Sequence, residues 1–251
     1  MSGHSKWSTI KRKKSAADAA RGKIFSKLIK EITIAARIGG GDSSANPRLR
    51  LAVQNAKSNN MPQDNITRAI KKGTGELEGV HYEEIIYEGY GPAGAALIIE
   101  CVTDNRNRTV SELRHLISRN GGNLAETGAV AWNFERKGVI TLPKGNYKEE
   151  DIFNIIIDAD ADDIVEEEDF FEVTSSLENF DKVRKALESS GLNIKIENAS
   201  LQYVAKTLTK VIGKEAEAVM KLINAVEEHD DVQNVYTNAD IDDKILAEIG
   251  D

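Results

Sequence analysis

The chain has very little cysteine and no long apolar run. Its single cysteine, Cys101, cannot form an internal disulfide, and its place beside an apolar run predicts a buried thiol that acts as a small hydrophobic side chain. The longest apolar runs span residues 95–99 and 155–157, far short of the ~20 residues that cross a membrane. No apolar segment typical of a secretory signal opens the chain. We therefore expect no membrane partner and a reducing compartment, by default the cytoplasm.

Motifs for catalysis and for cofactors are missing as well. The sequence has no phosphate-binding G-x-x-x-x-G-K, no nucleophile elbow G-x-S-x-G and no zinc-binding H-E-x-x-H. Its four histidines are scattered, without a second histidine or cysteine at ligand spacing: His4, His81, His115 and His229. We predict no catalytic residue, no metal, no cofactor and no small-molecule substrate, so that the protein is not an enzyme.

One glycine-rich stretch, residues 89–94, formally matches the dinucleotide-binding pattern G-x-G-x-x-G. That site needs a helix directly after the glycines, with its N-terminus facing the pyrophosphate. Here an apolar, strand-like run follows, and Pro92 stands inside the loop. The stretch therefore predicts a hairpin turn between two strands.

An acidic run, residues 158–169, is similar to the start of a calcium-binding loop. Eight of its twelve residues are Asp or Glu, but Asp163 stands at the sixth position, where glycine is needed, and Asp169 at the twelfth, where glutamate is usual. The run favours a solvated edge that discourages aggregation between strands. The alternative is a repulsive surface that orients the body away from nucleic acid.

Charge is distributed very unevenly. Residues 1–73 hold sixteen Lys and Arg against four Asp and Glu, a net charge of +12, whereas the remaining residues hold 17 against 37, a net charge of −20. The whole chain carries −8. A basic head on an acidic body indicates a polyanionic partner, and nucleic acid is the usual one.

The basic head predicts a mobile arm, residues 1–14, followed by three amphipathic helices. In the first helix, residues 15–38, Lys27, Lys30 and Arg37 fall within about 40° of Lys23 on a helical projection, opposite the apolar side chains. A second helix begins at Asn46-Pro47, with asparagine as the N-cap and proline in the first turn. A third begins near residue 62 or 64 and ends at residue 73. We expect a three-helix unit with its cations outside.

The rest of the chain alternates between strands and helices. Strands are expected at 82–90, 95–102 and 130–134, with a helix at 107–120. Residues 133–205 predict strand 139–142, helix 149–157, strands 163–167 and 171–175, helix 180–189 and strand 194–203, which is the ferredoxin-like order. Helix 214–227 and strand 232–236 would complete the sheet of residues 79–132.

The predicted fold is therefore α+β: an N-terminal three-helix domain followed by two ferredoxin-like α/β domains, the last inserted into the second. The expected boundaries are 1–78 for the arm and helices, 79–132 plus 206–251 for the discontinuous domain, and 133–205 for the insertion.

Two groups of residues are candidates for contact with nucleic acid. Cations flank Trp7 in the arm, which suits phosphate neutralisation and stacking on an unpaired base; a solvated tail with a packed tryptophan is the alternative. Arg106 and Arg108 stand where a strand leads into a helix, whose N-terminus favours an anion; with equal weight, Asn105 or Asn107 caps the helix and the arginines pair with carboxylates. The predicted nucleic-acid-binding residues are Lys6, Trp7, Lys11, Arg12, Lys13, Lys14, Arg21, Lys23, Lys27, Lys30, Arg48, Arg50, Arg68, Lys71, Lys72, Arg106 and Arg108.

Several stretches, in order along most of the chain, resemble the YebC family of bacterial gene-expression regulators, which includes a mitochondrial translational activator of a cytochrome oxidase subunit. The resemblance implies a helical N-terminal domain, two α/β domains with the last one inserted, and a bacterial cytoplasmic protein. Because it begins at Gly3, we expect no targeting presequence. It rests on the segments GHSKW (3–7), RGKIF (21–25), NPRLR (46–50), NMP (60–62), YEGYGP (87–92), TDNRNRT (103–109) and GGNL (121–124).

We expect a non-enzymatic nucleic-acid-binding regulator of gene expression. The resemblance implies two versions, a DNA-binding transcriptional regulator and a ribosome-associated translation factor that contacts ribosomal RNA or tRNA and assists elongation. The sequence shows no recognisable helix-turn-helix, and a basic arm with Trp7 suits RNA at least as well as a duplex groove. A third hypothesis is a protein–protein adaptor with a merely solvated head.

Overall fold

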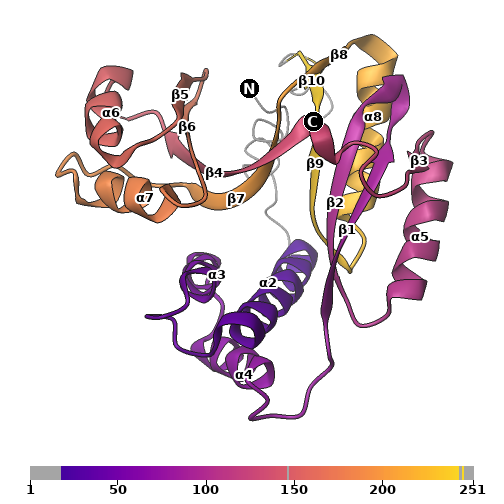
Figure 1. The fold of residues 1–251 in the computed structure, drawn as a ribbon, viewed down its shortest axis with the longest axis horizontal. Helices are drawn as coiled ribbons and strands as arrows, with labels where there is room; N and C mark the ends of the chain where they lie inside the picture. The colour runs from indigo at the N-terminus through magenta and orange to yellow at the C-terminus, as the bar shows by residue number, and fades with distance from the viewer. Residues whose placement is uncertain (1–17, 146, 243–244, 246–251) are drawn as a thin grey trace. The chain divides into compact units, whose positions relative to one another are not determined.

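The computed structural model describes residues 18–145, 147–242 and 245, and their fold is α+β (Figure 1). The contacts divide them into two compact units, residues 132–207 and the remaining described residues. The predicted fold class, N-terminal helices followed by two α/β regions of which the last is inserted, is confirmed. Within the described ranges, no helix is both long and apolar enough to cross a membrane.

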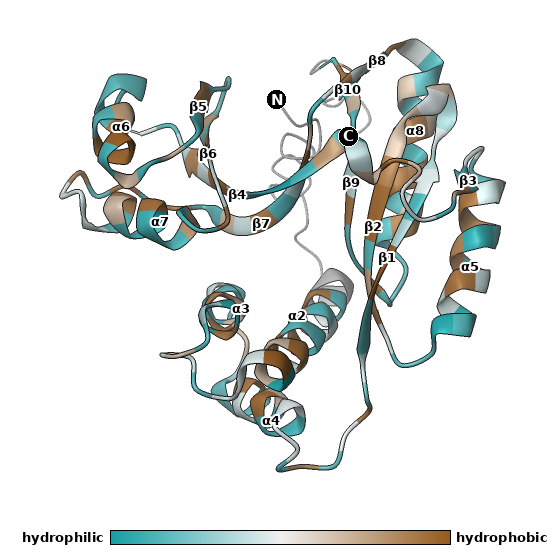
Figure 2. Cartoon of the chain, in the orientation of Figure 1, coloured by the Kyte–Doolittle hydropathy of each residue, from teal (hydrophilic) through white to brown (hydrophobic). Residues whose placement is uncertain are grey.

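Three helices open the larger unit: α2 (Asp18–Gly39), α3 (Pro47–Ser58) and α4 (Gln63–Gly73). All three were predicted, and α3 and α4 each pack mainly on α2. Asn46 is the N-cap of α3, as expected: its Oδ1 accepts from the Leu49 N–H at 3.0 Å, while its Nδ2 donates to the Ala35 carbonyl at 2.8 Å. One side chain thus joins the start of α3 to the end of α2. Brown apolar positions recur along these helices in Figure 2. Their apolar faces enclose a small core that includes Ile32, Leu49, Ala52, Ala56, Ile66 and Ala69.

A four-stranded antiparallel sheet follows, in the order β3-β1-β2-β9. Its strands are β1 (Glu83–Tyr90), β2 (Ala96–Thr103), β3 (Asn123–Leu124) and β9 (Val232–Thr237). Strands β1 and β2 form the predicted hairpin, and a strand follows its glycine-rich turn. Strand β9 pairs with β2 although residues 132–207 separate them in the chain. The C-terminal segment therefore completes the sheet that β1 and β2 begin.

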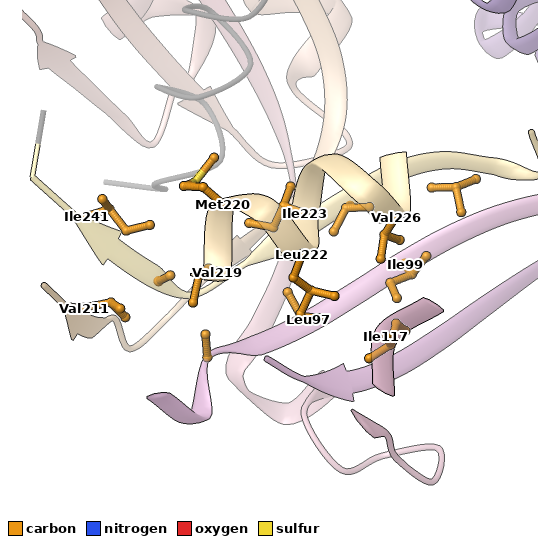
Figure 3. Packing of buried hydrophobic residues seen from close by; sticks show 14 of the residues in the cluster. Leu97, Ile99, Ile117, Val211, Val219, Met220, Leu222, Ile223, Val226 and Ile241 are labelled. Atoms are coloured by element: carbon orange, nitrogen blue, oxygen red, sulfur yellow. The ribbon is translucent and has the colours of Figure 1, made fainter. Parts of the chain in front are cut away.

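Helices α5 (Arg106–Arg119) and α8 (Gly213–Glu227) contribute to one core with this sheet (Figure 3). Cys101 belongs to that core, as predicted, and burial raises the pKa of its thiol to about 12. Such a thiol stays protonated near pH 7 and is a poor nucleophile. The core also includes Leu97, Ile99, Leu113, Ile117, Val219, Leu222, Ile223 and Val235.

The smaller unit has the predicted β-α-β-β-α-β order. Its sheet runs β5-β6-β4-β7, the strand order of a ferredoxin-like fold. The two ends of the unit meet at Asn133, whose side-chain amide bonds both the N–H and the carbonyl of Thr207 at 2.9 Å. The elements are β4 (Phe134–Pro143), α6 (Glu149–Ile156), β5 (Asp163–Glu166), β6 (Phe170–Ser175), α7 (Phe180–Ser189) and β7 (Asn198–Ala205).

Several strand predictions were wrong. Residues 130–134 do not form a strand of their own, because the buried carboxylate of Glu88 accepts the N–H groups of Gly128, Val130 and Ala131 at 2.6–2.9 Å and holds the backbone in a loop. Strand β7 begins at residue 198 rather than 194, after Asn193 adopts a left-handed φ of 51°. Strand β3 and a short parallel pair, β8 (Thr209–Val211) with β10 (Ala239–Ile241), were not predicted.

Candidate nucleic-acid interface

Part of the predicted interface lies outside the described residues. The arm residues Lys6, Trp7, Lys11, Arg12, Lys13 and Lys14 precede residue 18, and Arg21 lies in α2 but its side chain is not described. The predicted site residues whose side chains are described lie on α2, α3, α4 and α5.

The three lysines of the α2 stripe contact the end of α8 and the turn that follows it. Lys27 Nζ donates to the carbonyl of Glu227 at 3.1 Å, and Lys23 Nζ pairs with the carboxylate of Glu228. The last carbonyls of a helix have no partner inside the helix and carry its negative dipole end, so they attract cations. Two of the lysines predicted to bind phosphate thus stabilise the C-terminus of α8.

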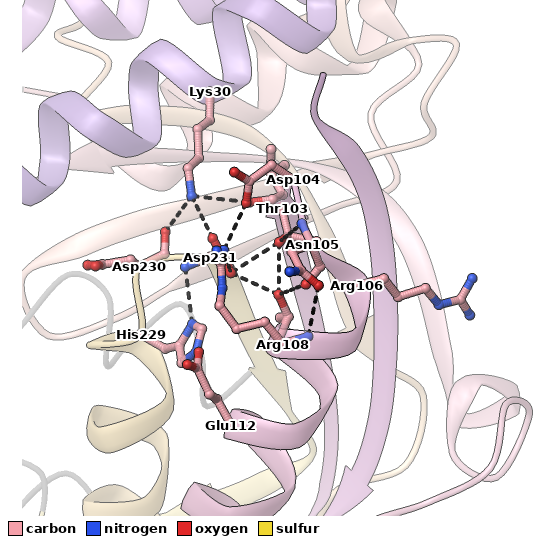
Figure 4. Close-up of polar contacts among 12 residues, drawn as sticks. Lys30, Thr103, Asp104, Asn105, Arg106, Arg108, Glu112, His229, Asp230 and Asp231 are labelled. Carbon is pink, nitrogen blue, oxygen red and sulfur yellow. Dashed lines mark hydrogen bonds and ion pairs between the residues drawn. The ribbon is translucent and has the colours of Figure 1, made fainter. Parts of the chain in front are cut away.

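The third lysine of the stripe, Lys30, is almost fully engaged. Its Nζ donates to the carbonyls of Val102 at 3.2 Å and Asp230 at 2.9 Å, and to Asp231 Oδ1 at 2.9 Å (Figure 4). An ammonium group has three N–H donors, and these three acceptors use all of them. The side chain is only 13% exposed. In this conformation Lys30 has no donor left for a phosphate.

Asp231 is the centre of this cluster. Its side chain is 5% exposed, and Oδ2 accepts from Arg108 Nη2 and Thr109 Oγ1, both at 2.8 Å, and from Thr103 Oγ1 at 3.1 Å. Burial by itself would raise the pKa of this carboxyl, but the bonds from Arg108, Lys30 and Thr109 outweigh it and hold the pKa well below its usual range. Asp231 is therefore ionised at neutral pH and joins α2, β2 and α5.

His229 orients the loop that carries Asp231. Its Nδ1 accepts from the Asp231 N–H at 3.1 Å, and its Nε2 lies 2.9 Å from a carboxylate oxygen of Glu112 on α5. Because Nδ1 is an acceptor, the ring proton sits on Nε2 and is donated to Glu112. This bond and the Lys30 bonds hold the turn between α8 and β9 from both sides.

The arginines of α3 are also paired. Arg48 forms a two-pronged ion pair with Glu31 of α2, with N–O distances of 2.8 and 3.0 Å, and a second pair with Glu84 of β1. Arg50 donates to the carbonyls of Ser43 and Ser44 at 3.1 and 3.0 Å. Arg48 therefore ties α2 and α3 to the start of the sheet.

Helix α4 differs from its neighbours. Arg68, Lys71 and Lys72 are exposed, and none of them forms an ion pair with a described residue. The apolar side chains of Ile66 and Ala69 face the core instead. Of the predicted site residues whose side chains are described, these three and Arg106 form no ion pair with another described residue.

At the start of α5, the two arginines behave differently. The Asn105 side chain caps the helix by accepting the Arg108 N–H at 3.1 Å. Arg108 pairs with Asp104 and Asp231, at 2.9 and 2.8 Å. The Arg106 side chain extends away from this cluster (Figure 4). Capping and carboxylate pairing thus account for Arg108, while Arg106 has no described ion pair.

The residue that organises the cluster, Asp231, was not predicted from the sequence. Its neighbour Asp230 is exposed, and the dipeptide gives no signal that one carboxylate is buried and the other is not. Arg114 and Arg119, two further exposed cations on the outer side of α5, were not predicted either. In the described ranges, no group of three or more His, Cys, Asp or Glu side chains is placed to hold a metal ion.

Comparison with known proteins identifies relatives along nearly the whole chain. Residues 5–76 match the family model described as the TACO1/YebC protein N-terminal domain, and residues 82–239 match that described as the TACO1/YebC second and third domain. A probable transcriptional regulatory protein of Desulforapulum autotrophicum is 54% identical over 98% of both chains. One of Geobacter sulfurreducens, with the same name, is 56% identical over 96% of both.

A solved structure agrees with these matches. The crystal structure of a conserved hypothetical protein from Aquifex aeolicus superimposes with a TM-score of 0.85 at 45% sequence identity, covering 93% of this chain and 96% of that one. The shared helical head, the shared sheets and matches that reach from residue 5 to residue 239 have one explanation, which is that this chain belongs to the TACO1/YebC family.

Proposed function

We propose that this protein is a non-enzymatic, cytoplasmic regulator of gene expression that binds nucleic acid through its basic head. The single observation that carries the proposal is the contrast within that head. The cations of α2 and α3 that make internal contacts are Lys23, Lys27, Lys30, Arg48 and Arg50. By contrast, α4 presents Arg68, Lys71 and Lys72 to solvent, and none of them forms an ion pair with a described residue. Three such cations on one short helix of an acidic protein favour a polyanion.

The position of these cations on α4 favours contacts to phosphates over reading of bases. They lie in the C-terminal half of the helix, and the exposed side chains of its first turn include an acidic one, Asp64. In helix-turn-helix proteins the N-terminal residues of the second helix approach the base edges. Contacts to phosphates alone give binding with little sequence preference and a strong dependence on salt.

Two roles are compatible with binding of this kind. The relatives are named probable transcriptional regulatory proteins, which favours a regulator of transcription. We take a DNA-binding regulator of this kind as the leading version. The second version is a ribosome-associated factor that binds ribosomal RNA or tRNA and assists elongation. The unpaired cations on α4 support this version as well, because phosphate contacts do not require a regular duplex.

Binding assays with matched charge reversals test the proposal. Full-length protein is titrated against single-stranded RNA, single-stranded DNA and duplex DNA of equal length, by fluorescence anisotropy at several salt concentrations. Reversal of Arg68, Lys71 and Lys72 to Glu is expected to weaken binding at least about tenfold and to flatten the salt dependence. The control reverses the exposed Lys210, Lys214 and Lys221, which changes the net charge equally.

The outcomes separate the alternatives. Equal losses in both triple variants would mean that only net charge matters, which contradicts a site on the head. If the protein binds no DNA or RNA at low salt, the adaptor hypothesis replaces this proposal. Preference for RNA together with co-sedimentation with ribosomes selects the translation factor, and preference for duplex DNA selects the transcriptional regulator.

A further inference from the structure

A groove of about 560 Å³ lies in the helical head, beside the ends of α2 and α4. The segment 74–82, which leads from α4 to β1, forms its other wall. Its lining side chains combine two properties. Arg37, Lys72 and His81 supply cationic or hydrogen-bonding groups, while Leu77 and Val80 supply apolar surface.

Among the described residues, no acidic side chain lines this groove. Glu76 and Glu78 stand in the same segment but do not belong to the lining, and Glu76 accepts a hydrogen bond from Thr74 at 2.9 Å. This lining follows the composition of the basic head, where residues 1–73 hold sixteen Lys and Arg against four Asp and Glu. A groove with cations and no carboxylate among its described lining residues is electrostatically suited to an anion.

The cations of the groove keep free donors. Arg37 Nη1 lies 3.2 Å from His81 Nε2 and donates to the carbonyl of Tyr82, which fixes the guanidinium at the edge of the groove. Its Nη2 and Nε make no hydrogen bond with any described residue. A guanidinium with its position fixed and three N–H groups unused is well prepared for a phosphate.

Lys72 is not needed to cap its own helix. The backbone N–H groups of Thr74, Gly75 and Leu77 already donate to the last carbonyls of α4, at 2.9–3.4 Å. The aliphatic stem of Lys72 packs against Gly79, where an added Cβ would lie 3.3 Å from the stem. Lys72 belongs to the lining of the groove, and its ammonium group forms no ion pair with a described residue.

The apolar wall is exposed. Val80 is 52% exposed and Leu77 42% exposed, whereas Ile32, Leu49 and Ile66 of the helical core are fully buried. An aliphatic surface beside free cations matches a ligand with a flat, weakly polar part and an anionic part. A nucleotide has both, since its base can pack against apolar side chains while its phosphate meets the cations.

We propose that this groove binds one nucleotide of a single-stranded nucleic acid, with its phosphate held by Arg37 and Lys72 and its base against Leu77 and Val80. This inference rests on the proposed function, which is nucleic-acid binding by the basic head, and adds where one nucleotide of the strand would bind. Arg68 lies four residues before Lys72 on α4, about 6 Å away along the helix axis and on the same side. The neighbouring phosphate of the strand can therefore follow α4 toward Arg68.

The test uses full-length protein and three probes: a single-stranded RNA with one photoreactive 4-thiouridine, AMP, and inorganic phosphate. The crosslink is expected within residues 77–82, and AMP is expected to bind more tightly than phosphate. Val80→Glu places a negative charge in the groove and is expected to weaken RNA binding about tenfold. Val80→Thr, which keeps the shape, is expected to change it less than twofold, and thermal melting checks that both variants fold.

The experiment gives different results if the groove proposal is wrong and if the proposed function is wrong. The first case is that RNA binds and that the Arg68→Glu/Lys71→Glu variant loses affinity, while Val80→Glu has no effect and no crosslink falls within residues 77–82. This result would exclude the groove as a binding site but would leave the proposed function in place. If no strand binds at low salt, both are excluded. Binding of AMP without binding of any RNA or DNA strand would identify a free nucleotide as the ligand. That result would contradict the proposal that the groove binds a nucleic-acid strand. Equal affinity for AMP and phosphate would show that the base makes no favourable contact with Leu77 and Val80.

Discussion

Helices α2 and α4 belong to the same basic head, yet their cations are used in different ways. Lys23, Lys27 and Lys30 of α2 donate to carbonyls and carboxylates at the end of α8 and in the turn that follows it. Lys71 and Lys72 of α4 form no ion pair with described residues. The two helices have the same amphipathic pattern, with cations opposite the apolar face.

The difference shows which structural features an amphipathic pattern predicts and which it does not. The period of a helix tells which side avoids the apolar core, because charged groups are costly to bury without partners. It does not tell whether the polar side meets water or the carbonyls of another element. The net charge of +12 in residues 1–73 therefore overstates the charge that this head offers to a partner.

The largest effect is expected from Asp231→Asn, which removes the charge that Lys30 and Arg108 share. Breaking one partner of a buried ion pair is strongly destabilising, and we expect a loss of about 3 kcal/mol in the free energy of unfolding. Urea unfolding measures it. Asp230→Asn is the control, because that side chain is exposed and its change is expected to stay within about 0.5 kcal/mol. Equal effects of the two substitutions would show that Asp231 does not organise the docking of α2.

The second largest effect is expected in the pH dependence of the unfolding free energy, which should involve the contacts of α2 but not the cations of α4. The pKa of Asp231 is lower in the folded protein than in the unfolded chain, so its stabilisation is complete above the unfolded pKa, about 4, and is lost as the pH falls through the folded pKa. From this group, stability is constant between pH 7 and 5 and decreases below pH 4. Asp231→Asn should flatten that decrease in urea titrations at pH 7, 5, 4 and 3, whereas Lys71→Met should leave it unchanged. A wild-type slope in Asp231→Asn contradicts the assignment.

A smaller effect is expected from exchanging single lysines for methionine. Lys30→Met removes three hydrogen bonds from a charged donor and should cost about 1–3 kcal/mol of unfolding free energy. Lys71→Met should cost less than about 0.5 kcal/mol. For affinity to nucleic acid the order is reversed, because only Lys71 is available to a phosphate. If Lys30→Met weakened binding more than Lys71→Met, α2 would have to leave α8 when the partner binds.

The smallest effect is expected in the salt dependence of binding. Each phosphate contact contributes about 0.7–0.9 to the slope of log K against log salt concentration. Lys71→Gln should reduce the slope by up to this amount, and Lys23→Gln, whose parent side chain already pairs with Glu228, should not change it. Anisotropy titrations between about 50 and 200 mM salt resolve the two. Equal slopes for both variants would count against a distinction between the helices.

Much of the fold could be predicted because local patterns determine it. The Asn46-Pro47 cap, the glycine-rich hairpin turn and the strand–helix alternation of the inserted unit all act over a few residues. The errors arose where distant residues decide. Residues 130–134 follow the hydrogen-bonding demands of Glu88, and the pair of β8 and β10 joins two three-residue segments about thirty residues apart.

The site was less predictable than the fold for the same reason. Composition located the basic head, and helical period placed its cations on outer faces. Which of them remain available depends on Asp231, on the carbonyls at the end of α8 and on Glu31 and Glu84, which pair with Arg48. Nothing near these cations in the chain indicates such partners.

The contact between Lys30 and Asp231 also sets an order for the synthesis of the chain. It joins residues separated by 201 positions, so the helices that leave the ribosome first receive their final partner almost last. Closing so long a loop has an entropic cost that grows with its length. The clamp between Asn133 and Thr207, which are 74 positions apart, brings the flanking segments together once the inserted unit has folded and so shortens the loop. Until residue 231 is made, the lysines of α2 are without these acceptors, and a nascent or truncated chain carries a more strongly cationic head than the finished protein.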